Sequence, residues 1–258
     1  MKICIPPPLP SSPNSLLHRG IHHALLLLQG AYHFTKTPLS DSLISKTQRA
    51  LQLHRLCKKL LRQLGVEVRV HGQIPTHGLI ITNHVSFLDI LLLSSIAPTT
   101  FVAKSEVAQW PIIGSIAANA GTLFIKRQSR TDVARLNIQV SEALQSGHSI
   151  TLFPEGTTTD GLSILPFQPS LLQPAIDLAS PVTPGFLTYT TPEGTYAEDL
   201  AYYGDRPLSQ CLFALLARRH TIATVSFGAA ITPSSHRKEF ATELHNAVQN
   251  LRKDLLTK

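Results

Sequence analysis

From residue 66 onward, short apolar runs alternate with longer stretches of helical periodicity, and this alternation constrains the fold of the chain most. Strands are expected at 66–70, 78–82, 101–104, 122–126, 149–153, 182–189 and 221–227. Helices are expected at 87–96, 105–120 with a break at Pro111, 132–145, 168–179, 208–219 and 239–255. Strands that alternate with helices of this length are typical of one parallel or mixed sheet covered by helices. The sequence therefore predicts an α/β fold with a mixed, largely parallel sheet flanked by helices. In such sheets, sites collect in the loops at strand ends.

The chain before residue 66 has a different composition and is predicted to be an appendage to this domain. Residues 1–14 are rich in proline and serine and are predicted to be disordered. Residues 15–34 are apolar but carry an arginine and four histidines, which makes them too polar for a spanning helix of about 20 mostly apolar residues. A helix that lies in the membrane interface fits this stretch better.

A second N-terminal helix is expected at residues 42–64, because leucines recur there at helical spacing beside a row of lysines and arginines. Such a basic face is either a solvated surface or a docking face for anionic lipid, where each basic residue contributes about 1 kcal/mol. The apolar segment before it favours docking. We therefore divide the chain into an amphipathic helical membrane-docking segment at 15–64 and a folded domain at 65–258. This division predicts a peripheral, monotopic protein on the cytoplasmic face of a membrane.

The net charge of the chain indicates the kind of partner it binds, and its cysteine content indicates the redox compartment. The net charge of +7 indicates an anionic partner, such as a membrane lipid surface, a phosphorylated substrate or an acidic carrier protein. No nucleic acid is expected, because aromatic residues make up only 6% of the chain and zinc-finger spacing is missing. The three widely spaced cysteines indicate a reducing compartment. No metal site is expected at His18, His22 and His23, since no carboxylate or cysteine nearby completes a ligand set.

The stretch from Asn83 to Asp89 joins a predicted buried strand to a leucine-rich helix. If His84 and Asp89 were both helical they would lie about 140° apart, because a helix turns about 100° per residue. They can face one another only if His84 precedes the helix. Asp89 then accepts a hydrogen bond from one ring nitrogen and leaves the other free as a general base. The aspartate of a Ser-His-Asp triad orients its histidine in the same way, but here no protein nucleophile is involved. On its own, the spacing is a weak signal.

Two further loops carry charged residues at predicted strand ends. Lys126, Arg127 and Arg130 follow the strand at 122–126, and Glu155 follows the strand at 149–153. Taken alone, the cations are more typical of a solvated loop than of an anion site. Glu155 alone is equally consistent with a turn or with a helix-capping carboxylate.

Taken together, four sequence blocks carry more information than any of them alone. They are Asn83-His84-x-x-x-x-Asp89, Gly121-x-x-Phe124-Ile125-x-Arg127, Phe153-Pro154-Glu155-Gly156-Thr157 and Pro181-Val182-x-Pro184. With these blocks in order, residues 66–230 resemble the glycerolipid acyltransferases that include lysophosphatidic acid acyltransferase. Lys104-Ser105-Glu106, Pro111 and Gly114 also resemble that family. The resemblance implies that 65–258 is an acyltransferase domain, that the N-terminal helices associate with membrane, and that no metal or organic cofactor is bound.

The resemblance also implies the substrates and the catalytic pair. The donor would be a fatty acyl thioester, either acyl-CoA or acyl carrier protein (acyl-ACP), and the acceptor would be a lysolipid. His84 would withdraw the proton of the acceptor hydroxyl as it attacks the thioester carbonyl. Asp89 would fix the ring tautomer and stabilise the imidazolium. Backbone N–H groups at the start of the following helix would stabilise the oxyanion.

The acceptor site is expected to combine cations with residues of the third block. Arg127, assisted by Lys104 or Lys126, would bind an acceptor phosphate through charge-assisted hydrogen bonds and align the hydroxyl with the donor. By resemblance, the same acceptor site includes Glu155, Gly156 and Thr157.

The third block departs from the commonest family pattern and leaves the acceptor open. Many lysophosphatidic acid acyltransferases have an arginine where this chain has Thr158, and Asp160 lies close by. A bare phosphate monoester benefits from two or more cations, so the missing arginine weakens the case for it. Lysophosphatidate, giving phosphatidic acid, is the first choice. A lysolipid with a zwitterionic or amino-acid headgroup, such as lyso-ornithine lipid, is the alternative.

Two other classes of protein share some of these features. An acyl thioesterase or lipid hydrolase would also process acyl esters, but no G-x-S-x-G nucleophile elbow occurs in the sequence. Ser86 fits a helix N-cap better than a nucleophile. A non-catalytic lipid-binding module would keep the basic helices without needing His84 and Asp89.

Overall fold

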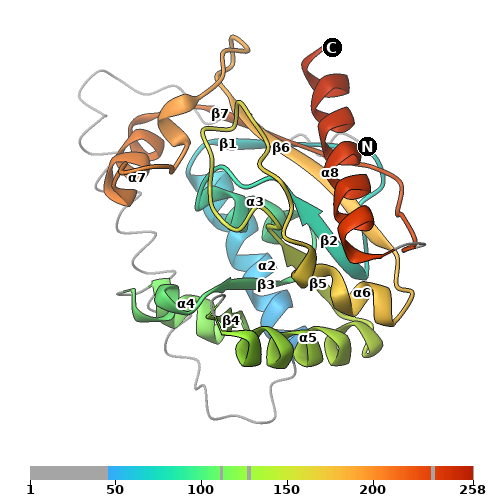
Figure 1. Cartoon of the computed structure of the whole chain (residues 1–258). Coiled ribbons are helices and arrows are strands. Elements are labelled where there is room, and N and C mark those ends of the chain that lie inside the picture. The colour runs from blue at the N-terminus through green and yellow to red at the C-terminus, as the bar shows by residue number, and fades with distance from the viewer. Residues whose placement is uncertain (1–45, 111–112, 127–128, 234–235, 258) are drawn as a thin grey trace.

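Seven strands of the described chain form one sheet in the order β1-β7-β6-β2-β5-β3-β4. The computed structural model describes residues 46–110, 113–126, 129–233 and 236–257. The strands are β1 (Val66–His71), β2 (Gly78–Thr82), β3 (Thr100–Lys104), β4 (Leu123–Ile125), β5 (Ser149–Leu152), β6 (Val182–Thr190) and β7 (Thr221–Phe227). Only β6 and β7 pair antiparallel; all other neighbours in this sheet are parallel. The predicted mixed, largely parallel sheet is confirmed (Figure 1).

The residue pattern of each strand matches its place in the sheet. The central strands β2, β5 and β6 are apolar or β-branched along nearly their whole length and are buried on both faces. The edge strand β1 instead alternates buried residues with half-buried or exposed ones. The bounds of β2 and β7 coincide with those predicted from the sequence.

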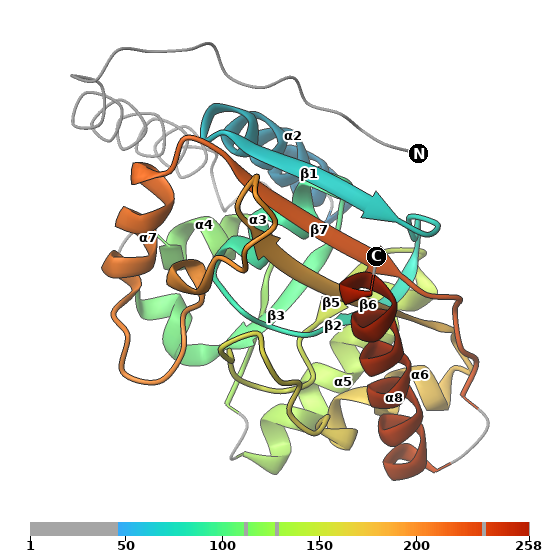
Figure 2. The same ribbon diagram turned by 90° about the horizontal axis from the view of Figure 1, so that it is seen from above.

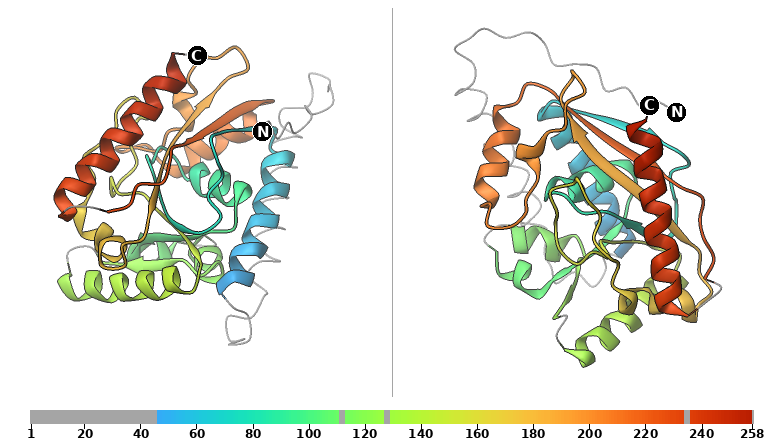
Figure 3. Two further views of the ribbon diagram at one scale, coloured as in Figure 1. Left: turned by 90° about the vertical axis from the view of Figure 1, so that its right-hand side faces the viewer. Right: turned by 45° about the horizontal axis from the view of Figure 1, so that its top comes forward.

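Helices cover both faces of the sheet, with a separate apolar core on each. One core includes residues of α2 (Lys46–Gln63), α3 (Leu88–Ile96) and α7 (Leu208–Ala217). The other includes residues of α5 (Arg130–Gln145), α6 (Gln173–Asp177) and α8 (Arg237–Leu256). The side view in Figure 3 shows α2 and α8 on opposite sides of the strands. The predicted flanking helices are therefore confirmed.

Two predicted helical stretches are each divided into two shorter elements. Residues 105–120 form a 3₁₀ turn, η1 (Ser105–Gln109), and the short α4 (Ile113–Asn119), with residues 111–112 outside the described residues. The stretch 168–179 is likewise divided into η2 (Pro169–Leu172) and α6. Proline lacks a backbone N–H and favours the first turn of a helix, so Pro174 suits a new start at α6. A third 3₁₀ turn, η3 (Glu198–Leu200), precedes α7.

Helix α2 packs as part of the folded domain. Its apolar positions Leu53, Cys57 and Leu61 are buried in the core that it shares with α3. Figure 2 shows α2 beside β1. The opposite side of α2 exposes a basic face, which we define as Arg55, Lys58, Lys59 and Arg62. Docking on a membrane stays a prediction for this face.

The remainder of the predicted docking segment, together with residues 1–14, lies outside the described residues. Within the part of the chain that the structure describes, we find no helix with the length and apolar character needed to cross a bilayer.

The sheet order brings the predicted site loops together. β2 lies between β5 and β6 and is parallel to both, so all three strands end at the same edge. Thr82, the last residue of β2, is opposite Gly185, so β6 continues beyond the end of β2. Asn83, which directly follows β2, is bonded to this extra length of β6. Its side chain accepts from the Leu187 N–H at 2.8 Å and donates to the Leu187 carbonyl at 3.0 Å.

Candidate active site

His84 and Asp89 face one another across the turn that begins α3. His84 lies in the loop after β2, and the helix starts at Leu88, so Asp89 sits in its first turn. The distance from His84 Nδ1 to Asp89 Oδ2 is 2.7 Å. The same oxygen accepts the backbone N–H groups of Val85 at 2.7 Å and Ser86 at 2.9 Å. The geometry inferred from the spacing, with the histidine before the helix, is the one that the structure shows.

These contacts determine which ring nitrogen carries the proton. An oxygen that accepts two backbone N–H groups acts as an acceptor, so Nδ1 of His84 must donate to it. The lone pair of the neutral ring is then on Nε2. Side-chain exposure is 0% for Asp89 and 19% for His84. A buried carboxylate therefore orients a ring that remains partly open to solvent.

The aromatic ring of Phe153 holds the imidazole from one face. The two ring centroids are 3.8 Å apart and the ring planes differ by 11°. Phe153 directly follows β5, and Phe101 on β3 is stacked behind it at 6.1 Å. This stack fixes the plane of the imidazole and keeps water from one of its faces.

The buried side chain of Glu155 connects the loop after β2 to the loop after β5. Its Oε1 accepts the backbone N–H of His84 at 2.8 Å, and its Oε2 accepts the backbone N–H of Leu165 at 2.7 Å. Burial raises the pKa of Glu155 to about 7; the two N–H groups oppose this shift and the charge of Asp89 adds to it. Both oxygens are thus used in holding backbone, one of them that of His84 itself. Its expected part in the acceptor site stays a prediction.

The loop that follows Glu155 is fixed at several points. The Thr159 N–H donates to the His84 carbonyl at 2.9 Å, which adds a second link to the loop after β2. From α8, Arg252 donates to the Leu162 carbonyl and His245 lies 3.2 Å from the Ile164 carbonyl. These contacts place Gly156 and Thr157 in a loop that is anchored on both sides.

Two glycines of this loop are required by backbone geometry. Gly156 has φ of 80° and Gly161 has φ of 77°, in the left-handed region that side chains disfavour. A Cβ on Gly161 would also lie 2.1 Å from the Tyr196 hydroxyl. The backbone conformation at position 156 therefore favours glycine, independently of the acceptor role that the family resemblance implies for Gly156.

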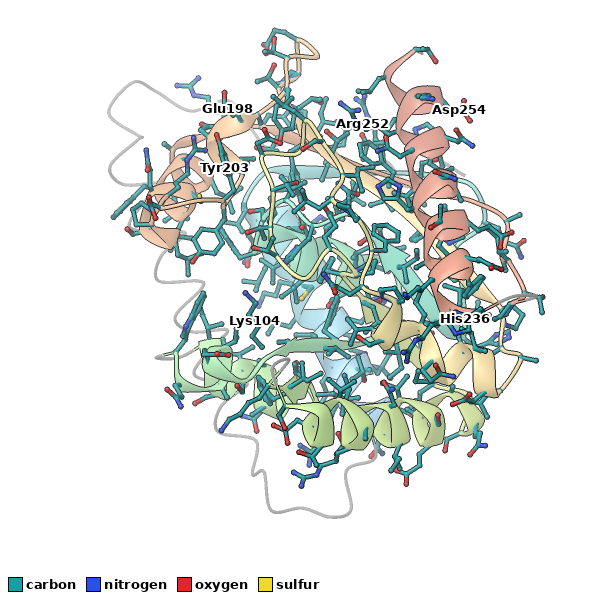
Figure 4. All side chains as sticks on the ribbon, in the orientation of Figure 1. Lys104, Glu198, Tyr203, His236, Arg252 and Asp254 are labelled. Atoms are coloured by element: carbon teal, nitrogen blue, oxygen red, sulfur yellow. The ribbon has the colours of Figure 1, made fainter. Side chains whose placement is uncertain are left out.

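The predicted cations are only partly described. Lys104 ends β3 and Lys126 follows β4, and these neighbouring parallel strands place both exposed side chains at one end of the sheet. Figure 4 shows Lys104 above β3 and beside α4. Arg127 and the side chain of Arg130 lie outside the described residues. The structure thus brings Lys104 and Lys126 near one another and leaves the expected role of Arg127 a prediction.

One sequence expectation at this site is wrong and one contact was missed. Ser86 does not cap α3: the N-cap position is Phe87, and no side chain bonds there. The Asp89 carboxylate holds the loop N–H groups, and Ser86 Oγ is buried without a hydrogen-bond partner in the structure. The missed contact is that of Tyr189 on β6, whose hydroxyl donates to Asp89 Oδ1 at 2.6 Å. Strand periodicity places Tyr189 in β6, but only the register of the sheet shows that it reaches Asp89.

Comparison with known proteins finds relatives of this chain by sequence and by fold. The family described as Acyltransferase matches residues 66–188. The chain is 37% identical over 175 residues to a 1-acyl-sn-glycerol-3-phosphate acyltransferase of Neisseria gonorrhoeae, an alignment that covers 67% of this chain and 68% of the relative. It is 32% identical over 260 residues to a lyso-ornithine lipid O-acyltransferase of Rhodobacter capsulatus, covering 95% of this chain and 92% of the relative.

A solved structure with the same fold is the crystal structure of the 1-acyl-sn-glycerophosphate acyltransferase PlsC from Thermotoga maritima. The two structures superpose with a TM-score of 0.60 at 18% sequence identity, over 93% of this chain and 100% of the other. At this identity the likeness concerns the fold, and it supports the helix-flanked mixed sheet predicted from the sequence.

Proposed function

The chain belongs to the acyltransferase family, and on this basis we propose that it transfers a fatty acyl group from an acyl thioester to the free hydroxyl of a lysolipid. The observation that supports this proposal most is the contact of His84 Nδ1 with the buried Asp89 carboxylate. This contact leaves Nε2 on the partly exposed side of the ring as the basic nitrogen. Among the described residues, no hydroxyl or thiol is hydrogen-bonded to Nε2 of His84, which suits direct transfer between two substrates.

The proposed reaction has a simple proton balance. Nε2 of His84 takes the proton of the acceptor hydroxyl while that oxygen attacks the thioester carbonyl, a contribution of about 10²- to 10⁴-fold. Asp89 stabilises the resulting imidazolium. When the tetrahedral intermediate collapses, the carbon–sulfur bond breaks and the thiolate leaves with the proton that the imidazolium returns. The products are the acylated lipid and a free thiol, with no bound cofactor needed.

For the acceptor we propose 1-acylglycerol-3-phosphate, giving phosphatidic acid, with lyso-ornithine lipid as the second candidate. The exposed amino groups of Lys104 and Lys126 support a phosphate, as does the name of the relative from Neisseria gonorrhoeae. Thr158 in place of an arginine, and Asp160 beside it, favour an acceptor with less negative charge. The relative aligned over 95% of this chain is named for lyso-ornithine lipid, which keeps the second candidate open.

The donor is proposed to be acyl-CoA or acyl-ACP, and the protein to act at the cytoplasmic face of a membrane as a peripheral enzyme. The basic face of α2 supports both parts of this proposal. An anionic membrane surface and an acidic carrier protein are each attracted to exposed lysines and arginines.

The test uses the full-length protein, a fatty acyl-CoA or acyl-ACP and a panel of lysolipids. A transferase releases free thiol only when an acceptor is present, whereas a thioesterase releases it without acceptor and a lipid-binding module releases none. Mass spectrometry of the lipids identifies the product. Thiol release that is the same with and without every acceptor would overturn the proposal. A product formed from lyso-ornithine lipid alone would make that lipid the first acceptor candidate.

A further inference from the structure

The ring of Tyr189 fills the core beneath the candidate active site and brings one polar atom to Asp89. Tyr189 lies on β6 and is the largest of the fully buried side chains in the described chain. Its hydroxyl lies 2.6 Å from Asp89 Oδ1, while Oδ2 is the oxygen that accepts from His84. Among the residues that the structure describes, Tyr189 is the one hydrogen-bond donor to Oδ1. The two oxygens of this carboxylate therefore have different partners.

The direction of this hydrogen bond follows from the surroundings. Asp89 is an acceptor at Oδ2, so the phenol is the donor at Oδ1. Burial, and then the negative charge of Asp89, raise the pKa of Tyr189 well above its usual value. The phenol is therefore protonated and donates to Asp89 Oδ1.

Tyr189 is not needed to aim the carboxylate. The backbone N–H groups of Val85 and Ser86 already hold Oδ2 in place beside the His84 ring. What the phenol adds is a donor to the second oxygen of a fully buried anion. A hydrogen bond to a charged form favours that form and disperses its charge. The contribution of Tyr189 should therefore appear in proton affinity more than in orientation.

We propose that Tyr189, acting through Asp89 by donating its hydroxyl to Oδ1, limits how readily the His84–Asp89 pair takes up a proton. The proposal rests on the proposed function of His84 as a general base. A general base works only while its nitrogen is free of a proton. Without the phenol, Oδ1 would be a buried anionic oxygen without a donor, and the pair would hold a proton up to a higher pH.

Other titratable groups also face Asp89. Glu155 comes from the loop after β5, and Tyr196 comes from the chain beyond β6; burial raises the pKa of both, and the charge of Asp89 adds to this shift. Neither is bonded to Asp89, and the Glu155 oxygens are occupied by backbone N–H groups. A change at the Tyr189 hydroxyl therefore acts first on Asp89.

The variant that tests the proposal is Tyr189→Phe, which keeps the ring and removes the donor. A lost hydrogen bond to a buried anion should move the acidic limb of the pH profile of kcat/KM upward by about 1 pH unit. At high pH the rate should stay within about threefold of wild type, because the free base is unchanged. A purely structural role would lower stability or rate at every pH and leave the limb in place.

The matched control is Tyr203→Phe. This tyrosine also donates to a carboxylate, Glu198 Oε1 at 3.2 Å, and both residues lie beside α7 (Figure 4). Loss of the Tyr203 hydroxyl should not move the acidic limb of the pH profile of kcat/KM. In an Asp89→Asn background, Tyr189→Phe should add no further shift, since the phenol acts through that carboxylate.

A second measurement needs no substrate. Diethyl pyrocarbonate modifies unprotonated imidazole, and peptide mass spectrometry follows His84 separately from the other histidines. The pH dependence of this modification should move upward in Tyr189→Phe and stay in place in Tyr203→Phe. This curve tests the inference even if no acyl transfer is found, so failure of the proposed function and failure of the inference are distinguishable.

An unchanged modification curve in folded Tyr189→Phe protein would overturn the inference. If that variant does not fold, replacing Tyr189 with 3-fluorotyrosine tests the same point. The fluorinated phenol is a stronger donor, so the curve should move to lower pH. A curve that stays at the wild-type position with the stronger donor would equally overturn it.

Discussion

The backbone N–H of His84 donates to Oε1 of Glu155 at 2.8 Å, so the proposed base is held by a carboxylate from a different loop. The other oxygen of Glu155 holds the Leu165 N–H. β2 and β5 are parallel neighbours, which is why the loops after them meet at one edge of the sheet. Glu155 thus sets the position of the His84 main chain, while Asp89 sets the direction of its ring.

Replacing His84 with alanine should reduce turnover about 10³-fold or more and leave the fold intact, because the ring serves as a base and is partly exposed. Steady-state thiol release, with circular dichroism on the same sample, measures both effects. Near-normal turnover by a folded variant would remove His84 from the mechanism.

Asp89→Asn should reduce kcat by roughly 10³-fold while the protein stays folded. The asparagine oxygen can still accept from Val85 and Ser86, and its amide can donate to the Tyr189 oxygen. What is lost is the charge that stabilises the imidazolium. Thermal unfolding and kcat separate these effects, and a variant with unfolded signatures would show that Asp89 is needed for structure first.

Glu155 should make stability depend on pH in an uncommon direction. Burial raises its pKa from a usual 4.5 to about 7, so the folded state binds the proton more tightly than the unfolded state. The stability from this group is complete below about pH 4.5 and is lost as pH rises through about 7, by up to about 3 kcal/mol. Glu155→Gln cannot titrate. Urea unfolding gives the free energy of unfolding of the wild type and of the variant at each pH from 4.5 to 7.5. Plotted against pH, the two free energies should have different slopes, and equal slopes would contradict the raised pKa of Glu155.

The basic face of α2 should contribute to binding of anionic membranes. Lys58→Gln with Lys59→Gln should weaken sedimentation with anionic vesicles by at least about tenfold at low salt, since each charge contributes about 1 kcal/mol. The matched control is Lys238→Gln with Lys253→Gln on α8, on the opposite side of the sheet (Figure 3). Equal loss in both pairs would mean that only net charge matters. Association that survives high salt and alkaline carbonate would indicate a spanning anchor instead.

Arg127→Ala should distinguish the two acceptor candidates. If phosphate is the handle, the Michaelis constant for lysophosphatidate should rise about tenfold or more, and that for the thioester should change little, because a charge-assisted hydrogen bond is lost on one substrate only. The measurement is initial rate against each substrate in turn. An equal defect for both substrates, or a wild-type enzyme that acylates lyso-ornithine lipid and ignores lysophosphatidate, would contradict lysophosphatidate as the acceptor.

Short-range features of this molecule were predictable from sequence. The apolar runs of β2 and β7 identified their bounds, and the five-residue separation of His84 and Asp89 was enough to infer their geometry. Partners from far along the chain were not predictable. Glu155 is 71 residues from His84, and Tyr189 is 100 residues from Asp89, so both contacts depend on how the strands pair.

The sequence also did not predict which apolar surface the apolar face of α2 packs against. The stripe of α2 has the same periodicity whether it meets a membrane or the core of its own domain. The structure shows it buried against α3. Sequence pattern alone does not record which apolar surface a helix covers.

The main-chain amides of Val85 and Ser86 belong to neither a strand nor a helix, yet both are bonded to the Asp89 carboxylate. Amides in such a loop normally exchange their hydrogens with water quickly, because no ladder protects them. Here their exchange is slowed only while the carboxylate keeps its position. Deuterium uptake at these two amides therefore reports whether the base is assembled, in the resting protein and before any lipid arrives.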